Sequence, residues 1–299
     1  MRAAYLKYIA ALLLVGSNGI ISSYIRLDSY EIVFLRTFIG SIFLTSFFFL
    51  SGGRPRGLKN KKDLAYLIAA GMAMGGNWMF LYEAYARVGV SVATLANYCG
   101  PVIVVALSPL LLRERLTVLK CAVFAVVLAG MFLVNGNALL TEGFSWGLAC
   151  GLMAALMYAF MVIFNKKAAG IAGLENAAFQ LLFSFLTVAA FMFAKRGFYF
   201  PPVTNLAPVL FLGVINTAVG CYLYFSAIPC LPAGIVAICG YLEPISALAL
   251  SALFLSERLA PPQMAGAFLI IGGAALYSAI SMYKRKEDIT AHNRQDDLR

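Results

Sequence analysis

The sequence predicts an all-α membrane protein built from ten transmembrane helices in two inverted five-helix repeats. Three observations predict this fold class: an apolar composition, ten long apolar blocks and an internal repeat at an offset of 143 residues. Of the 299 residues, 62% are hydrophobic and only 12% are charged. A water-soluble domain of this size needs far more charge to cover its surface.

Each apolar block is long enough to cross a hydrocarbon layer, for which a helix needs roughly 20 residues. The sequence lacks the period-two alternation that builds a membrane β-barrel, so the blocks predict helices. The predicted spans are 8–25, 31–50, 64–86, 91–112, 117–135, 145–165, 175–194, 206–228, 233–255 and 263–283.

Arg2 and Lys7 precede the first block as in a secretory signal, but no A-x-A cleavage site follows, so we expect an uncleaved span. We expect two repeat domains, 8–135 and 145–283, followed by a solvated cytoplasmic tail of mixed charge at 284–299.

The distribution of basic residues predicts the orientation. Placing the N-terminus inside puts 16 Lys and Arg residues on the cytoplasmic side and 5 on the opposite side. Both termini are therefore predicted to be cytoplasmic, with the protein in the cell (inner) membrane. These bases flank the membrane and account for the net charge of +10 without a nucleic-acid partner. The expected partners are the lipid bilayer and a small-molecule substrate, and the sequence leaves a homodimer open.

An internal repeat relates the two halves of the chain. The segment "NYCGPVIVVALSPLLLRERL" (97–116) aligns without gaps on "GYLEPISALALSALFLSERL" (240–259). The matched pairs include Tyr98 with Tyr241, Pro101 with Pro244 and Glu114 with Glu257. Because five spans is an odd number, the second copy should enter the membrane inverted. Inverted repeats with a substrate site between them are a recurring plan of secondary transporters.

Three motifs indicate a family. One is a proline followed by an "ERL" ending in each half, the second is "FLRTFIG" (34–40), and the third is "FLYEAYARVGVSVATL" (80–95). Together with the ten spans and the repeat, they make the chain resemble the EamA-like branch of the drug/metabolite transporter superfamily over nearly all of its first 283 residues. One departure is the absence of the tryptophan that is frequent in the family's first span. The resemblance implies a ten-helix carrier of small organic solutes, often directed outward.

Glu243 is the deepest acid in the predicted spans, and it precedes Pro244. A charge at the bilayer centre costs about 2.5–3.5 kcal/mol on insertion scales, so such a residue usually faces protein or water. Pro244 has no amide hydrogen, so the carbonyl of Gly240 loses its helical partner and the span should kink. We expect Glu243 to contact a cationic substrate group or an exchanging proton. The alternative is that it only ties two helices together.

The first half places different residues at the related positions. Gly100 stands where Glu243 stands in the second half, and the neighbouring Pro101 predicts a matching kink. Polarity comes instead from Asn97 and Tyr98. A cavity between the halves should therefore be polar overall and negative toward the second half.

Several further residues are candidates for binding substrate. In the third span, Trp78 and Tyr82 share one helix face with Gly71 and Gly75, which predicts close packing that opens into an aromatic-walled cavity. Arg36 could hold a substrate carboxylate, pair with Glu31 or another acid, or reach the headgroups. The full set of binding candidates is Glu243, Trp78, Tyr82, Asn97, Tyr98, Tyr241, Asn18, Tyr158 and Arg36, with helix kinks at Pro101 and Pro244.

The sequence argues against the other common classes of membrane protein. It has no D-x-x-D, H-E-x-x-H or G-x-S-x-G pattern for a membrane enzyme and no P-loop for an ATP-driven pump. The single histidine, His292, lies in the tail, and none of the six cysteines has C-x-x-C spacing, so we expect no metal and no cofactor. Glu114 and Glu257 are expected to make helix-end and loop pairs rather than to bind solute.

These observations predict a secondary transporter, exporting small organic metabolites such as amino acids or amines by alternating access. The alternative is a passive channel or a lipid-translocating protein, since both can also use polar helix faces.

Overall fold

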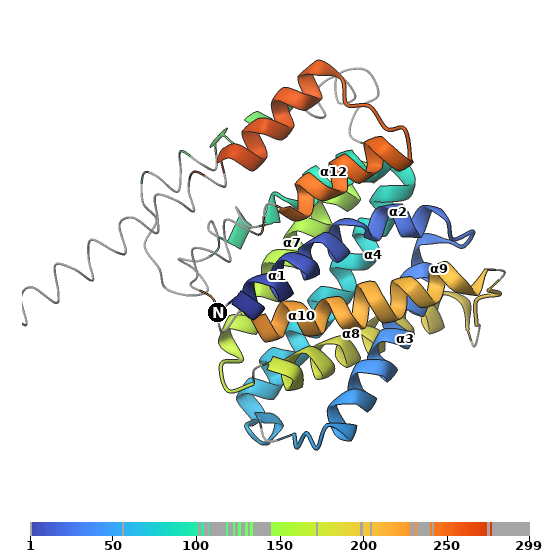
Figure 1. Ribbon diagram of the computed structural model, residues 1–299, viewed down its shortest axis with the longest axis vertical. Helices are drawn as coiled ribbons and strands as arrows, with labels where there is room; N and C mark the ends of the chain where they lie inside the picture. The colour runs from blue at the N-terminus through green and yellow to red at the C-terminus, as the bar shows by residue number, and fades with distance from the viewer. Residues whose placement is uncertain are drawn as a thin grey trace, which may run out of the picture.

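The computed structural model describes residues 2–55, 57–100, 145–171, 173–197, 200–203, 205–227 and 242–273, together with scattered positions outside these ranges. Within this part of the chain every regular element is a helix, and the helices gather into one bundle (Figure 1). Their bounds are α1 Arg2–Gly16, α2 Asn18–Ser23, α3 Ser29–Leu50, η1 Gly57–Lys59, α4 Lys61–Asn97, α7 Trp146–Lys167, α8 Gly173–Arg196, α9 Leu206–Leu210, η2 Phe211–Val219, α10 Gly220–Ala227 and α12 Leu242–Phe254. Residues 261–273 are also helical.

Six helical stretches in the described ranges are long and apolar enough to cross a membrane. They are Ala3–Ser23, Ser29–Leu50, Lys61–Asn97, Trp146–Lys167, Gly173–Lys195 and Leu206–Ala227. The expectation of an all-helical, multi-pass membrane protein is therefore confirmed for the described part of the chain. The count of ten spans stays a prediction, because most of 101–144 and 228–241 lies outside the described residues.

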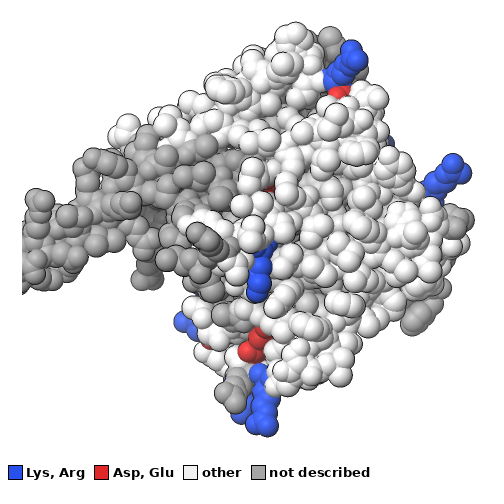
Figure 2. Space-filling view, in the orientation of Figure 1, with Lys and Arg blue, Asp and Glu red and all other residues white. Residues whose placement is uncertain are grey.

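The outer surface of the bundle suits a hydrocarbon environment. Large apolar side chains such as Phe43 and Phe47 of α3 and Phe193 of α8 are exposed. On the face shown in Figure 2, charged side chains are few and most lie toward its edges. Charge at the ends and apolar residues between them are what a helix bundle surrounded by lipid requires.

The first span begins at Arg2 and not at the predicted residue 8. Lys7 remains on the helix because its ammonium lies 5.5 Å from the centroid of the Tyr222 ring, where the long stem can pack and the charge meets the π face. The same span is interrupted at Ser17, which separates α1 from α2.

Helix α4 contains the third predicted span and the start of the fourth. Its 37 residues are interrupted at Gly89, whose φ of 79° and ψ of 165° are not helical. This combination is essentially confined to glycine, because a Cβ would collide with the backbone. The chain thus makes a sharp break at Gly89 and begins a new helical segment at Val90.

Residues Phe211–Val219 form a π-helix that the sequence analysis did not predict. The Thr217 hydroxyl donates a hydrogen bond to the Leu212 carbonyl five residues earlier, at 2.7 Å. Asn216 and Thr217 both make long-range hydrogen bonds from this segment, Asn216 to the first span and Thr217 to α3. π-Turns are rare and frequently occur at functional sites.

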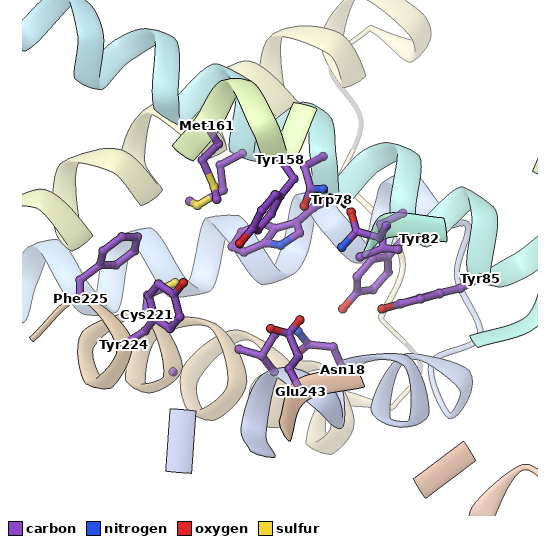
Figure 3. Close-up of a pocket in the computed structure, with 16 residues that line it drawn as sticks. Asn18, Trp78, Tyr82, Tyr85, Tyr158, Met161, Cys221, Tyr224, Phe225 and Glu243 are labelled. Carbon is purple, nitrogen blue, oxygen red and sulfur yellow. Dashed lines mark hydrogen bonds between the residues drawn. The ribbon is translucent and has the colours of Figure 1, made fainter. Parts of the chain in front are cut away.

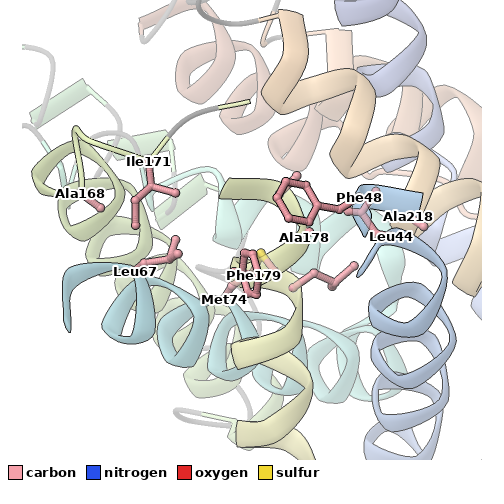
Figure 4. Close-up of a cluster of buried hydrophobic side chains, with 11 residues drawn as sticks. Leu44, Phe48, Leu67, Met74, Ala168, Ile171, Ala178, Phe179 and Ala218 are labelled. Carbon is pink, nitrogen blue, oxygen red and sulfur yellow. The ribbon is translucent and has the colours of Figure 1, made fainter. Parts of the chain in front are cut away.

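The core forms where helices of both halves meet. α4 packs along α7 and α8, α3 packs along α8 and η2, and α1 packs along α10 and α12. One cluster of buried side chains joins α3, α4, α8 and η2 (Figure 4). It comprises Leu44, Phe48, Leu67, Met74, Ala168, Ile171, Ala177, Ala178, Phe179, Leu181 and Ala218.

The glycines of α4 allow its close approach to α8. A Cβ on Gly71 would lie 2.5 Å from the Phe183 Cβ and 2.8 Å from the Gln180 carbonyl oxygen. A Cβ on Gly75 would lie 2.9 Å from the Ser184 carbonyl oxygen. Small residues at these positions let two helix backbones meet, which is the main source of helix association in a membrane.

We expect Gly71→Ala to destabilise the protein by about 1–3 kcal/mol, the usual cost of overpacking a close contact. The added methyl group meets α8 backbone and the first carbon of a side chain, neither of which can rotate away. The measurement is the thermal unfolding midpoint of the purified protein in detergent.

Gly76→Ala on the same helix is the matched control. Its Cβ would come no closer than 3.4 Å, to the flexible Met157 side chain, so this variant should keep the wild-type midpoint or exceed it. Equal midpoints for the two variants would contradict the packing of α4 on α8.

Candidate functional site

A cavity of about 110 Å³ lies inside the bundle, between helices of the two halves. Its walls come from the first span, α4, α7, α10 and α12 (Figure 3). The lining residues are Val15, Asn18, Met74, Asn77, Trp78, Leu81, Tyr82, Tyr85, Asn97, Tyr158, Met161, Gly220, Cys221, Tyr224, Phe225 and Glu243. The cavity thus combines several aromatic rings with three asparagines and one carboxylate.

Glu243 lies in the first turn of α12 and faces the aromatic wall formed by α4 and α7 in Figure 3. Its carboxylate interacts with the Tyr98 hydroxyl. The ion pair between Glu83 and Arg87, at 3.0 Å, does not involve Glu243, and no Lys or Arg of the described residues pairs with Glu243. The cavity therefore holds a carboxylate whose partner is a neutral phenol and not a cation.

Pro244 lies in the first turn of α12, and the kink expected at this proline stays a prediction. Pro244 is buried beside Glu243, and the carbonyl of Gly240 does not remain free but accepts a hydrogen bond from the Tyr98 hydroxyl at 3.3 Å. Tyr98 of the first half is therefore bound to the backbone of the second half just before α12.

Arg36 is 1% exposed and is among the largest fully buried side chains of the protein. Its Nε donates to the Thr217 hydroxyl at 2.9 Å and its Nη1 donates to the Tyr82 hydroxyl. Its guanidinium carbon lies 4.3 Å from the centroid of the Trp78 ring. The alternative that Arg36 reaches the headgroups is wrong, because the side chain is enclosed by α3, α4 and η2.

The hydrogen bond between Arg36 and Tyr82 determines whether Tyr82 donates or accepts hydrogen bonds at the cavity wall. A guanidinium can only donate hydrogen bonds, so the Tyr82 oxygen is the acceptor. The phenolic hydrogen is then available to be donated elsewhere, and Tyr82 lines the cavity. Arg36 does not itself line the cavity, yet its charge acts there through the Tyr82 hydroxyl and the Trp78 ring.

The asparagines are held by a second set of hydrogen bonds. The Asn77 amide donates to the Asn97 carbonyl oxygen at 2.9 Å and to the Ala154 carbonyl at 2.8 Å. The Asn216 amide donates to the Asn18 carbonyl oxygen at 3.1 Å. Because the oxygens of Asn18 and Asn97 each accept one of these bonds, the N–H groups of the two amides are left to donate, and both residues line the cavity.

The structure brings most of the predicted site residues together. Six line the cavity: Asn18, Trp78, Tyr82, Asn97, Tyr158 and Glu243. Arg36 lies directly behind them and is hydrogen-bonded to Tyr82. Tyr98 lies beside Glu243. Tyr241 and Pro101 lie outside the described residues.

The sequence analysis missed Asn77, Met161, Tyr224 and Phe225, which also line the cavity. Asn77 carried a usable signal, because an amide in the middle of an apolar span needs an internal partner. Met161, Tyr224 and Phe225 carried none, since apolar and aromatic residues are equally common on lipid-facing sides.

Comparison with known proteins decides the family. The profile of the EamA-like transporter family matches the chain twice, at residues 2–136 and 145–279. The chain belongs to the EamA-like transporter family. This confirms the resemblance to the drug/metabolite transporter superfamily, and it makes the protein a membrane transporter in general function.

Individual relatives are similar over most of their length. An uncharacterized transporter of Bacillus subtilis, YxxF, is 27% identical over 91% of this chain and 88% of its own. A probable terminal-alkyne amino-acid exporter of Streptantibioticus cattleyicolor is 26% identical over 81% and 80%. An S-adenosylmethionine uptake transporter of Rickettsia felis is 25% identical over 74% and 84%.

A solved crystal structure supports the fold of this EamA-like transporter. It superposes with a TM-score of 0.63 at 18% identity and covers 96% of this chain and 99% of its own. At this level of identity the likeness concerns the fold alone.

We expect Thr217→Val to destabilise the transporter by about 1–3 kcal/mol, the usual cost of leaving a buried donor unpaired. The substitution keeps the side-chain shape and removes the oxygen that accepts from Arg36. Thermal unfolding of the purified protein provides the measurement.

Thr45→Val is the matched control, because the Thr45 hydroxyl is buried without a hydrogen-bond partner among the described residues. It should leave the unfolding midpoint unchanged or raise it. A Thr217→Val protein as stable as the wild type would show that the hydroxyl does not matter to Arg36.

Proposed function

We propose that this protein is a secondary transporter that exports small organic metabolites, such as amino acids or amines, across the cytoplasmic membrane by alternating access. The observation that carries the proposal is the polarity of the cavity. Glu243 offers a carboxylate on one wall, and Tyr82, bonded to Arg36, offers a hydroxyl donor on another.

This polarity suits a solute with a cationic and an anionic group. An ammonium would be attracted to Glu243, which has no cationic partner among the described residues. A carboxylate would accept from the Tyr82 hydroxyl and from the amides of Asn18 and Asn97. The rings of Trp78 and Tyr158 would cover the apolar part of the solute and the face of its ammonium.

Two relatives support the same solute class. Their names specify a terminal-alkyne amino acid and S-adenosylmethionine, and both compounds carry an α-amino group and a carboxylate. One relative is named for export and the other for uptake, so the outward direction proposed here rests on the general tendency that the resemblance implies.

We further propose ten spans in two inverted repeats, 8–135 and 145–283, with both termini and the 284–299 tail in the cytoplasm. The two profile matches, at 2–136 and 145–279, and the gapless repeat of "P…ERL" support this arrangement. A passive channel or a lipid-translocating protein is the alternative. Saturable, stereoselective counterflow in liposomes distinguishes a carrier from both.

The decisive experiment on the solute site uses wild-type protein and Glu243→Gln. In a thermal-shift screen of amino acids, amines, nucleosides and sugars, we expect amine-bearing solutes to stabilise the wild type in proportion to their excess over Kd. Glu243→Gln keeps the shape and removes the charge. Losing a charged hydrogen bond costs about 1.5–3 kcal/mol, which is roughly tenfold or more in Kd.

The same variant should lose counterflow of the stabilising solute while its own unfolding midpoint remains close to wild type. Glu83→Gln is the matched control, since Glu83 is an acid of α4 that pairs with Arg87 outside the cavity. If Glu243→Gln shows wild-type counterflow, the Glu243 charge does not bind the solute and the residue only holds helices together.

We expect tags in the 136–144 loop and in the tail to be accessible from opposite sides of the membrane in intact cells. The five predicted spans of the second repeat separate the 136–144 loop from the tail, and an odd number of crossings puts the two tags on opposite sides. If both tags were accessible from the same side, the second repeat would not be inverted. The argument for alternating access between two inverted halves would then fail.

A further inference from the structure

Glu257 makes a contact between the two halves outside the cavity. Its carboxylate accepts hydrogen bonds from the backbone N–H groups of Val90 and Ser91, both at 2.9 Å, and from the Ser91 hydroxyl at 2.7 Å. The Ser91 and Ser251 hydroxyl oxygens lie 2.7 Å apart. We call these four residues, Val90, Ser91, Ser251 and Glu257, the Glu257 latch.

The backbone on both sides is shaped for this contact. The break at Gly89 creates a helix N-terminus whose first N–H groups have no partner within the helix, and an acidic side chain is the natural acceptor for them. A Cβ on Gly89 would lie 2.9 Å from the Glu257 Oε1. On the other side, Ser256 adopts a left-handed φ of 54°, and the N–H of Glu257 donates to the Ser251 carbonyl at 3.3 Å.

The Glu257 latch lies at one end of the cavity and joins the two helices that carry its opposed polar groups. On α4, Gly89 follows the cavity residue Tyr85 by four residues, roughly 6 Å along the axis. On α12, Ser251 follows Glu243 by eight residues, roughly 12 Å along the axis. Separating α4 from α12 at this end therefore requires the latch to break.

We propose that the Glu257 latch is the gate that closes this end of the cavity, and that its opening gives the solute access from the side of the membrane carrying the 87–91 and 255–260 segments. The proposal rests on alternating access. Three of the latch's hydrogen bonds run from the first half to the single carboxylate of Glu257, so the closed state depends mainly on that side chain. A gate of this kind can open without unfolding either helix.

The test needs no solute, so it can fail independently of the proposed function. In a chain whose six native cysteines are replaced, Ser91→Cys and Ser251→Cys place two thiols where two hydroxyls now touch. With a mild oxidant the pair should form a disulfide within minutes in the wild-type background. Adding Glu257→Gln should slow disulfide formation at least fivefold, because the latch then spends less time closed.

A second readout follows opening directly. In the chain without its native cysteines, Tyr85→Cys should react with a membrane-impermeant maleimide at least fivefold faster when Glu257→Gln is added. Glu83→Gln, on the same helix as Tyr85, is the matched control and should change neither rate. Size-exclusion profiles and unfolding midpoints report whether each variant is folded.

Slower disulfide formation together with faster maleimide labelling supports the gate. Unchanged rates in a folded Glu257→Gln protein would overturn it and leave Glu257 as a static helix cap. If Glu257→Gln does not fold, the test is whether Ser91→Cys and Ser251→Cys form a disulfide in the chain that keeps Glu257. A chain without that disulfide would overturn the proposal, because the two segments would then not meet.

Discussion

The guanidinium of Arg36 is a full positive charge inside an apolar bundle, and much of the structure around it serves to satisfy it. Desolvating such a charge is costly unless its donors are all directed to acceptors or π faces. Thr217 of η2 and Tyr82 of α4 supply the acceptors, and the Trp78 ring covers one face. Three helices from both halves of the chain are thereby fixed around one side chain, and the cavity lies on the far side of Tyr82 and Trp78.

The charges of the cavity arise because the two repeats differ at matched positions. Gln180 occupies the position related to Arg36, and its amide oxygen accepts from Asn165 instead of serving the cavity. Gly100 occupies the position related to Glu243, and a Cβ there would lie 2.6 Å from the Tyr158 ring. An acid at position 100 and a tyrosine at position 158 therefore exclude each other. The repeat keeps the backbone plan, while these differences place a carboxylate on one wall and a buried guanidinium behind the other.

The all-helical membrane fold and six of the residues that line the cavity could be predicted from the sequence for a physical reason: in hydrocarbon, polar residues must turn inward. Glu243, Asn18 and Asn97 could be identified simply because they interrupt apolar runs. The partner of Arg36 could not be identified this way. The nearest acid in sequence, Glu31, accepts from the Asp28 amide at 2.9 Å in a capping box, whereas the actual partner Thr217 is 181 residues away on a π-helix. Contacts of that range depend on how helices dock, which periodicity and composition do not encode.

The same two helices carry the cavity and the Glu257 latch, so the two are mechanically connected. A solute that bridges Glu243 of α12 and Tyr82 of α4 draws these helices together, and the latch holds them together at one end. By linkage, a contact that favours the closed arrangement must raise the affinity for a solute that bridges both walls, and bound solute must stabilise the latch by the same free energy. Release of the solute on the latch side then requires a state in which two sets of contacts are weakened. These are the contacts of the solute with Glu243 and Tyr82 and the hydrogen bonds of the Glu257 latch. Glu243 of α12 takes part in the bridge, and Glu257, three residues beyond the end of α12, forms the latch, so one segment of the second half carries both carboxylates.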